Sequence, residues 1–270
     1  MRALGVEMLS ALGLPPLELV ALSADLGCQH ISTGLNQMPA AYNPLGHADW
    51  SLRDDAALRR EMIALMADRG VSISLGEGFA IRPGASIRDR AGDMDLMAEL
   101  GARGLGAVSM EADQARAADE LALLADMAAE RDMLATIEFA PGQAVATLDQ
   151  ALAMVRHVAR PTFGLLVDAM HLFRSGSTVA DLAAINPAHI LYAQLCDAPA
   201  GPPGDAYMGE AMFARRAPGD GELPLADFVA ALPADIPIGL EVPNLAAAQA
   251  GQPDHDRIGR AVAAARALIS

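Results

Sequence analysis

The stretch Leu165–Gly176, LLVDAMHLFRSG, runs from apolar residues directly into an acid, Asp168, and places His171 three positions later. A short run that is apolar without alternation is typical of a strand buried on both faces, as in a parallel sheet. An acid at the end of such a strand is either a cap for the helix that follows or a ligand at the mouth of a cavity. The rest of the chain decides between these interpretations.

Short apolar runs recur along the whole chain, and longer segments with helical spacing separate them. The eight runs are Ala3–Leu9, Cys28–Ser32, Val71–Leu75, Gly104–Met110, Leu134–Phe139, Thr162–Val167, Ile190–Leu195 and Ile236–Val242. The clearest helical segments are Leu52–Arg69, Ile87–Leu100, Ala112–Arg131 and Leu148–Ala159. Strands that alternate with helices in this number predict a parallel sheet closed into a (β/α)8 barrel. An open doubly wound sheet is the alternative, but it normally has a Gly-rich turn after its first strand, and this sequence has none there.

Local signals support the same layout. Thr147 followed by Gln150 predicts a capping box at a helix start, and Ser51 with Asp54 is a weaker example. No linker or change of composition divides the chain, so residues 1–270 are predicted to form one domain. Two connections, 34–50 and 197–223, are long enough to be binding loops or lids, and in a barrel both would lie at the C-terminal face.

Composition narrows the classes of function. The net charge is −15, which disfavours nucleic acid as a partner. All 19 basic residues are arginine, so Schiff-base chemistry and the lysine of a phosphate-binding P-loop are excluded. The two cysteines fit no zinc spacing or disulfide framework, and no apolar run is long enough to span a bilayer. We therefore expect a soluble cytoplasmic protein that acts on a small molecule, without a membrane partner, as a possible homodimer or homotetramer.

Polar side chains with oxygen donors end four consecutive predicted strands. They are Glu138, Asp168, Gln194 and Glu241. Consecutive strands of a closed barrel are neighbours, so these side chains should converge on one rim of its mouth. Three carboxylates and an amide oxygen form a set of ligands suited to a hard divalent ion such as Mn, Mg or Co. Glu77, after the third strand, is predicted to contact the substrate.

The segments IEFAPG, LLVDAMH, AQLCDAP, RRAPGDGELPL and GLEVPN together resemble the xylose-isomerase-like sugar isomerase and epimerase superfamily. That superfamily includes ketose 3-epimerases, inosose dehydratase, 3-dehydroshikimate dehydratase and apurinic endonucleases. The resemblance implies that Glu138, Asp168, Gln194 and Glu241 hold a metal ion and that His171 and Arg216 bind substrate. Gln194 stands where the ketose epimerases have a histidine, and this substitution makes zinc less favoured.

The chemistry implied is proton transfer at a carbon next to a carbonyl group. Glu138 and Glu241 are predicted to take and return the proton, so a small polyhydroxylated carbonyl compound is isomerised or epimerised through an enediolate. Dehydration of an inosose or of 3-dehydroshikimate by the same first step is the main alternative. A nuclease for abasic DNA and a barrel that only binds a ligand are the other two hypotheses.

Overall fold

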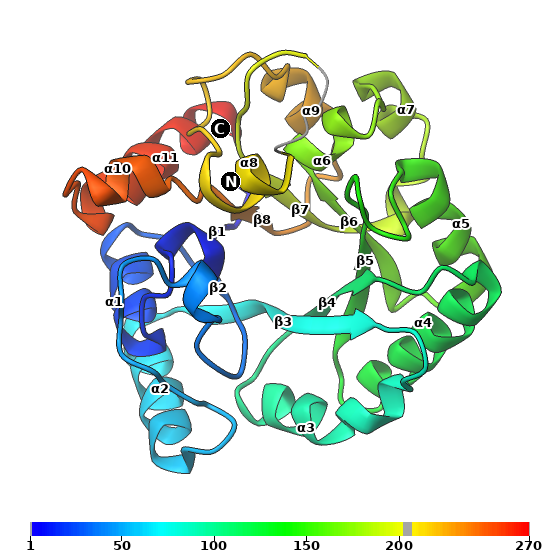
Figure 1. Ribbon diagram of the computed structural model, residues 1–270, viewed down its shortest axis with the longest axis horizontal. Coiled ribbons are helices and arrows are strands. Elements are labelled where there is room, and N and C mark those ends of the chain that lie inside the picture. The colour runs from blue at the N-terminus through cyan, green and yellow to red at the C-terminus, as the bar shows by residue number, and fades with distance from the viewer. Residues whose placement is uncertain (1, 202–206, 270) are drawn as a thin grey trace.

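The computed structural model describes residues 2–201 and 207–269 and shows a closed parallel barrel in which every strand pairs with its neighbours along the chain, β1 with β8 included. Figure 1 looks down this barrel, with the helices arranged around it. The strands are β1 Leu4–Val6, β2 His30–Thr33, β3 Ser72–Ile81, β4 Gly104–Ser109, β5 Leu134–Glu138, β6 Phe163–Asp168, β7 Ile190–Leu195 and β8 Ile238–Leu240. The predicted single-domain (β/α)8 fold is confirmed. Of the predicted loop 197–223, residues 202–206 lie outside the described part of the chain.

The α-helices follow the strands in the expected alternation. They are α1 Pro16–Asp25, α2 Ala56–Arg69, α3 Ala91–Glu99, α4 Gln114–Ala129, α5 Leu148–Val158, α6 Ala169–Arg174, α7 Val179–Ala183, α8 Tyr207–Phe213, α9 Leu225–Ala231, α10 Leu245–Gln249 and α11 Asp254–Ile269. Short 3-10 helices are η1 Met8–Ala11, η2 Ala40–Tyr42, η3 Ile87–Arg90 and η4 Pro187–His189.

Of the two helix caps predicted from the sequence, the structure shows one and not the other. Thr147 forms the expected capping box with Gln150 at the start of α5. The prediction for Ser51 was wrong, because α2 begins at Ala56 and its cap is Asp55, whose carboxylate accepts two backbone N–H bonds. Ser51 instead donates to Asp54 within the preceding loop at 2.7 Å. The predicted helix Ile87–Leu100 is likewise divided into η3 and α3.

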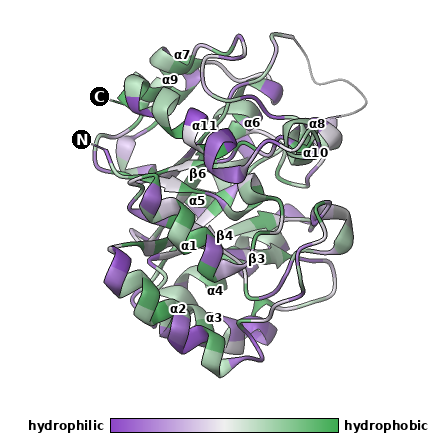
Figure 2. Ribbon diagram, turned by 90° about the vertical axis from the view of Figure 1, so that its left-hand side faces the viewer, coloured by the Kyte–Doolittle hydropathy of each residue, from purple (hydrophilic) through white to green (hydrophobic). Residues whose placement is uncertain are grey.

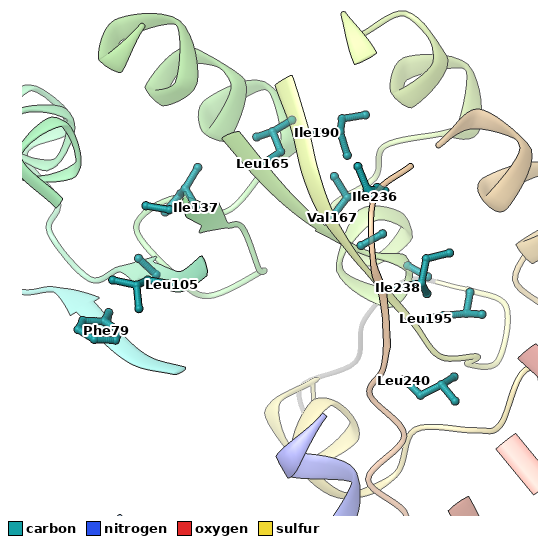
Figure 3. Close-up of a cluster of buried hydrophobic side chains, with 14 of the residues drawn as sticks. Phe79, Leu105, Ile137, Leu165, Val167, Ile190, Leu195, Ile236, Ile238 and Leu240 are labelled. Atoms are coloured by element: carbon teal, nitrogen blue, oxygen red, sulfur yellow. The ribbon is translucent and has the colours of Figure 1, made fainter. Parts of the chain in front are cut away.

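Successive side chains along each strand point alternately outward, toward the helices, and inward, into the barrel. Leu165 and Val167 of β6 belong to the large apolar cluster between strands and helices, part of which is drawn in Figure 3. Leu166 belongs instead to a small separate cluster with Leu75 and Tyr192. The helices carry both apolar and polar residues along their length (Figure 2), as expected for elements with one face on this core. This cluster inside the barrel is small, which leaves space for polar groups between it and the C-terminal mouth.

No helix in the described residues has both the length and the hydropathy needed to cross a bilayer.

Candidate active site

The predicted strand-end residues do come together at the C-terminal mouth of the barrel. Asp168 on β6 is in register with Gln194 on β7, and Gln194 is in register with Gly239 on β8, two residues before Glu241. A cavity of about 190 Å³ opens there and is lined by Glu77, Glu138, Gln194 and Glu241 among others. The convergence expected from the sequence is therefore present in the structure, although binding by these residues stays a prediction.

Asp168 answers the question raised by the strand that ends in it. One carboxylate oxygen accepts the backbone N–H of His171 at 2.8 Å and so caps α6. The other oxygen accepts a hydrogen bond from Arg215 Nη1 at 2.7 Å. The side chain is fully buried. The cap interpretation is confirmed, whereas binding of a ligand by this acid stays a prediction.

Arg215, rather than Arg216, enters the site. Its guanidinium is 2% exposed and joins Asp168 to Glu241, with Nη2 2.7 Å from Glu241 Oε2. Arg215 Nε donates to the carbonyl of Ala211 at the end of α8. Arg216 is exposed and donates to the carbonyl of Asp220. The sequence favoured Arg216 for the site, and the structure places its neighbour Arg215 there instead.

The reason for this correction is backbone geometry. The N–H and C=O of Arg216 pair with Asp197 in an antiparallel bridge, which turns consecutive side chains to opposite sides. The sequence shows two adjacent arginines and does not show which of them faces inward.

His171 lies beside the acids and is held in place by Tyr207. The Tyr207 hydroxyl is 2.6 Å from His171 Nδ1, and His171 Nε2 is 3.6 Å from Glu138 Oε1. Burial, together with the charge of Arg215, lowers the pKa of His171 to about 4 against the opposing effect of Asp168. The imidazole is therefore neutral at pH 7. Tyr207 was not predicted from the sequence, because α8 follows a connection that carries no strand-end signal.

The carboxyl groups have different ionisation behaviour. Burial raises the pKa of Glu138 well above its usual value, and the nearby charges of Glu241 and Asp168 add to this. Burial also raises the pKa of Glu241, to about 7, although Arg215 opposes the change. Burial acts in the same direction on Asp168, but Arg215 and His171 outweigh it and leave the pKa lowered. The mouth thus combines one ionised acid with two that hold protons more tightly.

A second group of acids, one fully buried and one half-buried, lies next to the first. Glu7, immediately after β1, is fully buried and accepts a hydrogen bond from the Tyr192 hydroxyl at 2.7 Å. Glu77 on β3 accepts from Ser32. Burial raises the pKa of both acids, and Glu77 also responds to the charges of Glu7 and Glu241. Glu7 was missed because it was counted within an apolar run; an acid inside such a run is the signal that identifies it.

The donors present fit a hard divalent ion. Gln194 Oε1 is buried and has no hydrogen-bond partner, so an amide oxygen is available beside three carboxylates. Three acids face one guanidinium, which leaves an excess negative charge if all are ionised. In the described residues no three His, Cys, Asp or Glu side chains are grouped closely enough to form a preformed site. Arg215 already uses one oxygen each of Asp168 and Glu241, and the other oxygen of Asp168 accepts the His171 N–H, so an ion would share that oxygen with the helix cap.

A curated protein is similar to this chain in sequence. The chain is 31% identical over 233 residues to a 3-dehydroshikimate dehydratase of Pseudomonas aeruginosa. The aligned region covers 79% of this chain and 35% of that protein. The chain therefore spans only about a third of the length of this curated relative.

Solved structures share the fold at lower identity. The zinc-bound IolI protein has a TM-score of 0.81 at 18% identity and covers 100% of this chain and 98% of its own. The probable 3-dehydroshikimate dehydratase AsbF of Bacillus anthracis has a TM-score of 0.75 at 13% identity, with 98% and 99% covered. A D-psicose 3-epimerase has a TM-score of 0.73 at 14% identity, with 100% and 99% covered.

The family model described as xylose isomerase-like TIM barrel matches residues 20–268, which include every strand from β2 to β8 and all the acids of the mouth except Glu7. With the closed barrel and the converging acids already seen, this match identifies the chain as a member of the xylose isomerase-like TIM barrel family.

Proposed function

We propose that this chain is a divalent-metal-dependent enzyme that removes a proton next to the carbonyl group of a small polyhydroxylated compound. The observation that carries the proposal is the convergence of Glu138, Gln194 and Glu241 on one cavity, with the amide oxygen of Gln194 buried and unpartnered. Asp168 lies behind them, in register with Gln194 on the neighbouring strand. Relatives that share the fold are named for dehydration and epimerisation, and both reactions begin with this step.

Each residue has a role set by its surroundings. Glu138, with a side chain 19% exposed to the cavity, takes the proton, and Glu241 on the neighbouring part of the rim donates one. A pKa of about 7 makes Glu241 suited to proton exchange near neutral pH. Neutral His171 and cationic Arg215 provide hydrogen bonds for substrate oxygens and for developing negative charge.

Glu138, Asp168, Gln194 and Glu241 would hold the ion. When bound, a divalent cation supplies a Lewis acid that polarises the carbonyl group and stabilises the enediolate. Metal analysis and thermal melting with added Mn or Mg test this part directly. EDTA-treated protein that gains no stability from any divalent ion at millimolar concentration would contradict it.

Dehydration is the outcome we favour, because the curated relative is a 3-dehydroshikimate dehydratase. In that outcome the carbanion equivalent expels a β-hydroxyl group, which leaves as water after Glu241 protonates it. Epimerisation is the second candidate, supported by the shared fold of the D-psicose 3-epimerase. It requires return of a proton to the opposite face of the same carbon.

One experiment separates the two outcomes. Metal-loaded protein is incubated in deuterated water with 3-dehydroshikimate, an inosose or one of a panel of ketoses. The masses of the products are then measured by mass spectrometry. Loss of water indicates a dehydratase, whereas deuterium gain without loss of water indicates an epimerase. We expect Glu241→Gln to reduce the rate about 100-fold or more, the scale for losing a general acid. Binding without turnover or exchange would support the ligand-binding alternative instead.

A further inference from the structure

A second cavity adjoins the mouth of the barrel. It has a volume of about 420 Å³ and lies between the loop after β2 and the middle of β3. Its wall includes Glu77 and Gly78, which also line the cavity that contains Glu138 and Glu241. A compound bound at the mouth therefore has space to extend past Glu77 into this adjoining cavity.

The adjoining cavity has an unusual arrangement of charge. Arg53 and Arg90 both line it, and both form ion pairs with Asp93. Asp93 is 5% exposed, whereas the arginine side chains are 39% and 37% exposed. Two positive charges share one buried negative charge, so one positive charge is left without an acidic partner in this cluster.

Both guanidinium groups are held in place. Arg53 Nη2 donates to Asp93 Oδ2 at 2.9 Å. Arg90 lies over the ring of Phe79, with Cζ 5.5 Å from its centroid, and donates to the carbonyl of Gly78. Fixed, partly exposed guanidinium groups bind an anionic group with little loss of side-chain entropy.

The other acid that lines this cavity, Glu77, lies at its border with the mouth of the barrel and accepts a hydrogen bond from Ser32. Burial and the neighbouring charges of Glu7 and Glu241 raise the pKa of Glu77 well above its usual value, which favours its neutral form. The remaining wall is mainly apolar; it includes Met8, Leu35, Met38 and Met212.

From this arrangement we infer that Arg53 and Arg90 bind a carboxylate of the substrate, so that the substrate is a hydroxy-carbonyl acid rather than an uncharged sugar. This inference rests on the proposed function, because it assigns the opposite end of the same substrate. The excess of one positive charge matches a carboxylate, whereas a phosphate ester carries about −1.5 to −2 at pH 7.

The experiment compares two probes that differ only by a carboxylate, 3,4-dihydroxybenzoate and catechol. Their binding to the whole chain is measured by calorimetry, once with Mg²⁺ and once with EDTA. We expect 3,4-dihydroxybenzoate to bind about tenfold or more tightly than catechol, the scale of a hydrogen bond to a charged group. Equal affinity of the two probes, or no measurable binding of 3,4-dihydroxybenzoate, would overturn the inference.

Variants of the pair should remove the preference. In the double variant Arg53→Gln/Arg90→Gln the two probes should bind equally. Arg88→Gln is the matched control, because Arg88 is exposed, lies on the same 3-10 helix as Arg90 and lines neither cavity. Loss of the preference in Arg88→Gln would show that general surface charge, rather than this pair, is responsible.

The double variant leaves Asp93 without a cation, so a second variant guards against a simple loss of folding. Asp93→Asn removes the only acid of the cluster and should increase the preference for 3,4-dihydroxybenzoate. A decrease would contradict the inference. Stronger displacement of this probe by inorganic phosphate than by acetate would assign the site to phosphate and overturn the carboxylate. Since neither probe must react, failure of this inference is separate from failure of the turnover experiment.

Discussion

Asp168 and Glu241, at the ends of β6 and β8, share the guanidinium of Arg215. Glu7, directly after β1, and Glu77, on β3, instead have mainly hydroxyl groups and each other as partners. Both pairs are inside the same barrel. A guanidinium stabilises the charged form of an acid, so Asp168 has a lowered pKa, while neutral donors do not overcome burial at Glu7. The same guanidinium does not overcome burial at Glu241, whose pKa is raised to about 7, so the balance between partner and burial at each carboxyl group decides whether it is ionised.

The largest effect is expected from removing the cation of the first pair. Arg215→Met leaves Asp168 and Glu241 buried without a positive partner, and the free energy of unfolding should fall by about 3–5 kcal/mol. Urea denaturation of metal-free protein measures this. Arg216→Met is the matched control, because Arg216 is exposed, and it should change stability by less than about 0.5 kcal/mol. Equal effects of the two variants would mean that Arg215 does not compensate these acids.

The pH dependence of stability tests Glu241 itself. Because burial raises its pKa from 4.5 to about 7, the folded state binds more protons than the unfolded state between these pH values. Stability of EDTA-treated protein should therefore fall as pH rises from about 4.5 to 7, by about 3 kcal/mol from this group. Denaturation curves at several pH values should show a shallower slope for Glu241→Gln. Parallel curves for the variant and the wild type would contradict the assignment.

A smaller effect should follow from filling the space around Glu7. A Cβ added at Gly239 would lie 1.5 Å from Glu7 Oε1, so Gly239→Ala must displace this carboxyl group from Tyr192. We expect a loss of about 1–3 kcal/mol, as for other overpacked interiors. Gly92→Ala in α3 is the control, since nothing lies within 4 Å of the added methyl group and alanine favours a helix. If Gly239→Ala were as stable as Gly92→Ala, the second pair would be more adaptable than the structure indicates.

The fold was predictable because its signals are local and repeated. Apolar runs and amphipathic segments alternate along the chain, and their number is sufficient to predict closure of the sheet. Boundaries were less well predicted: β1 and β8 are shorter than their apolar runs, and β3 continues to Ile81. Strand ends depend on pairing with neighbours, which a single segment does not encode.

The polar residues at the ends of β5 to β8 were predictable for the same reason. Each follows an apolar strand, and consecutive strands of a barrel are neighbours, so chain order alone indicated that Glu138, Asp168, Gln194 and Glu241 would converge. Their register and the buried oxygen of Gln194 agree with that expectation.

Only the tertiary structure decided which groups surround these acids. Arg215 and Tyr207 reach the mouth from α8 and the segment after it, where no periodic pattern indicates which side chains face inward. The charge left on Arg53 and Arg90 depends on a shared Asp93 that is 40 residues from the first arginine. Sequence order determines which strands are neighbours, but the ionisation and pairing of a buried group depend on distances and burial that arise only when the chain is folded.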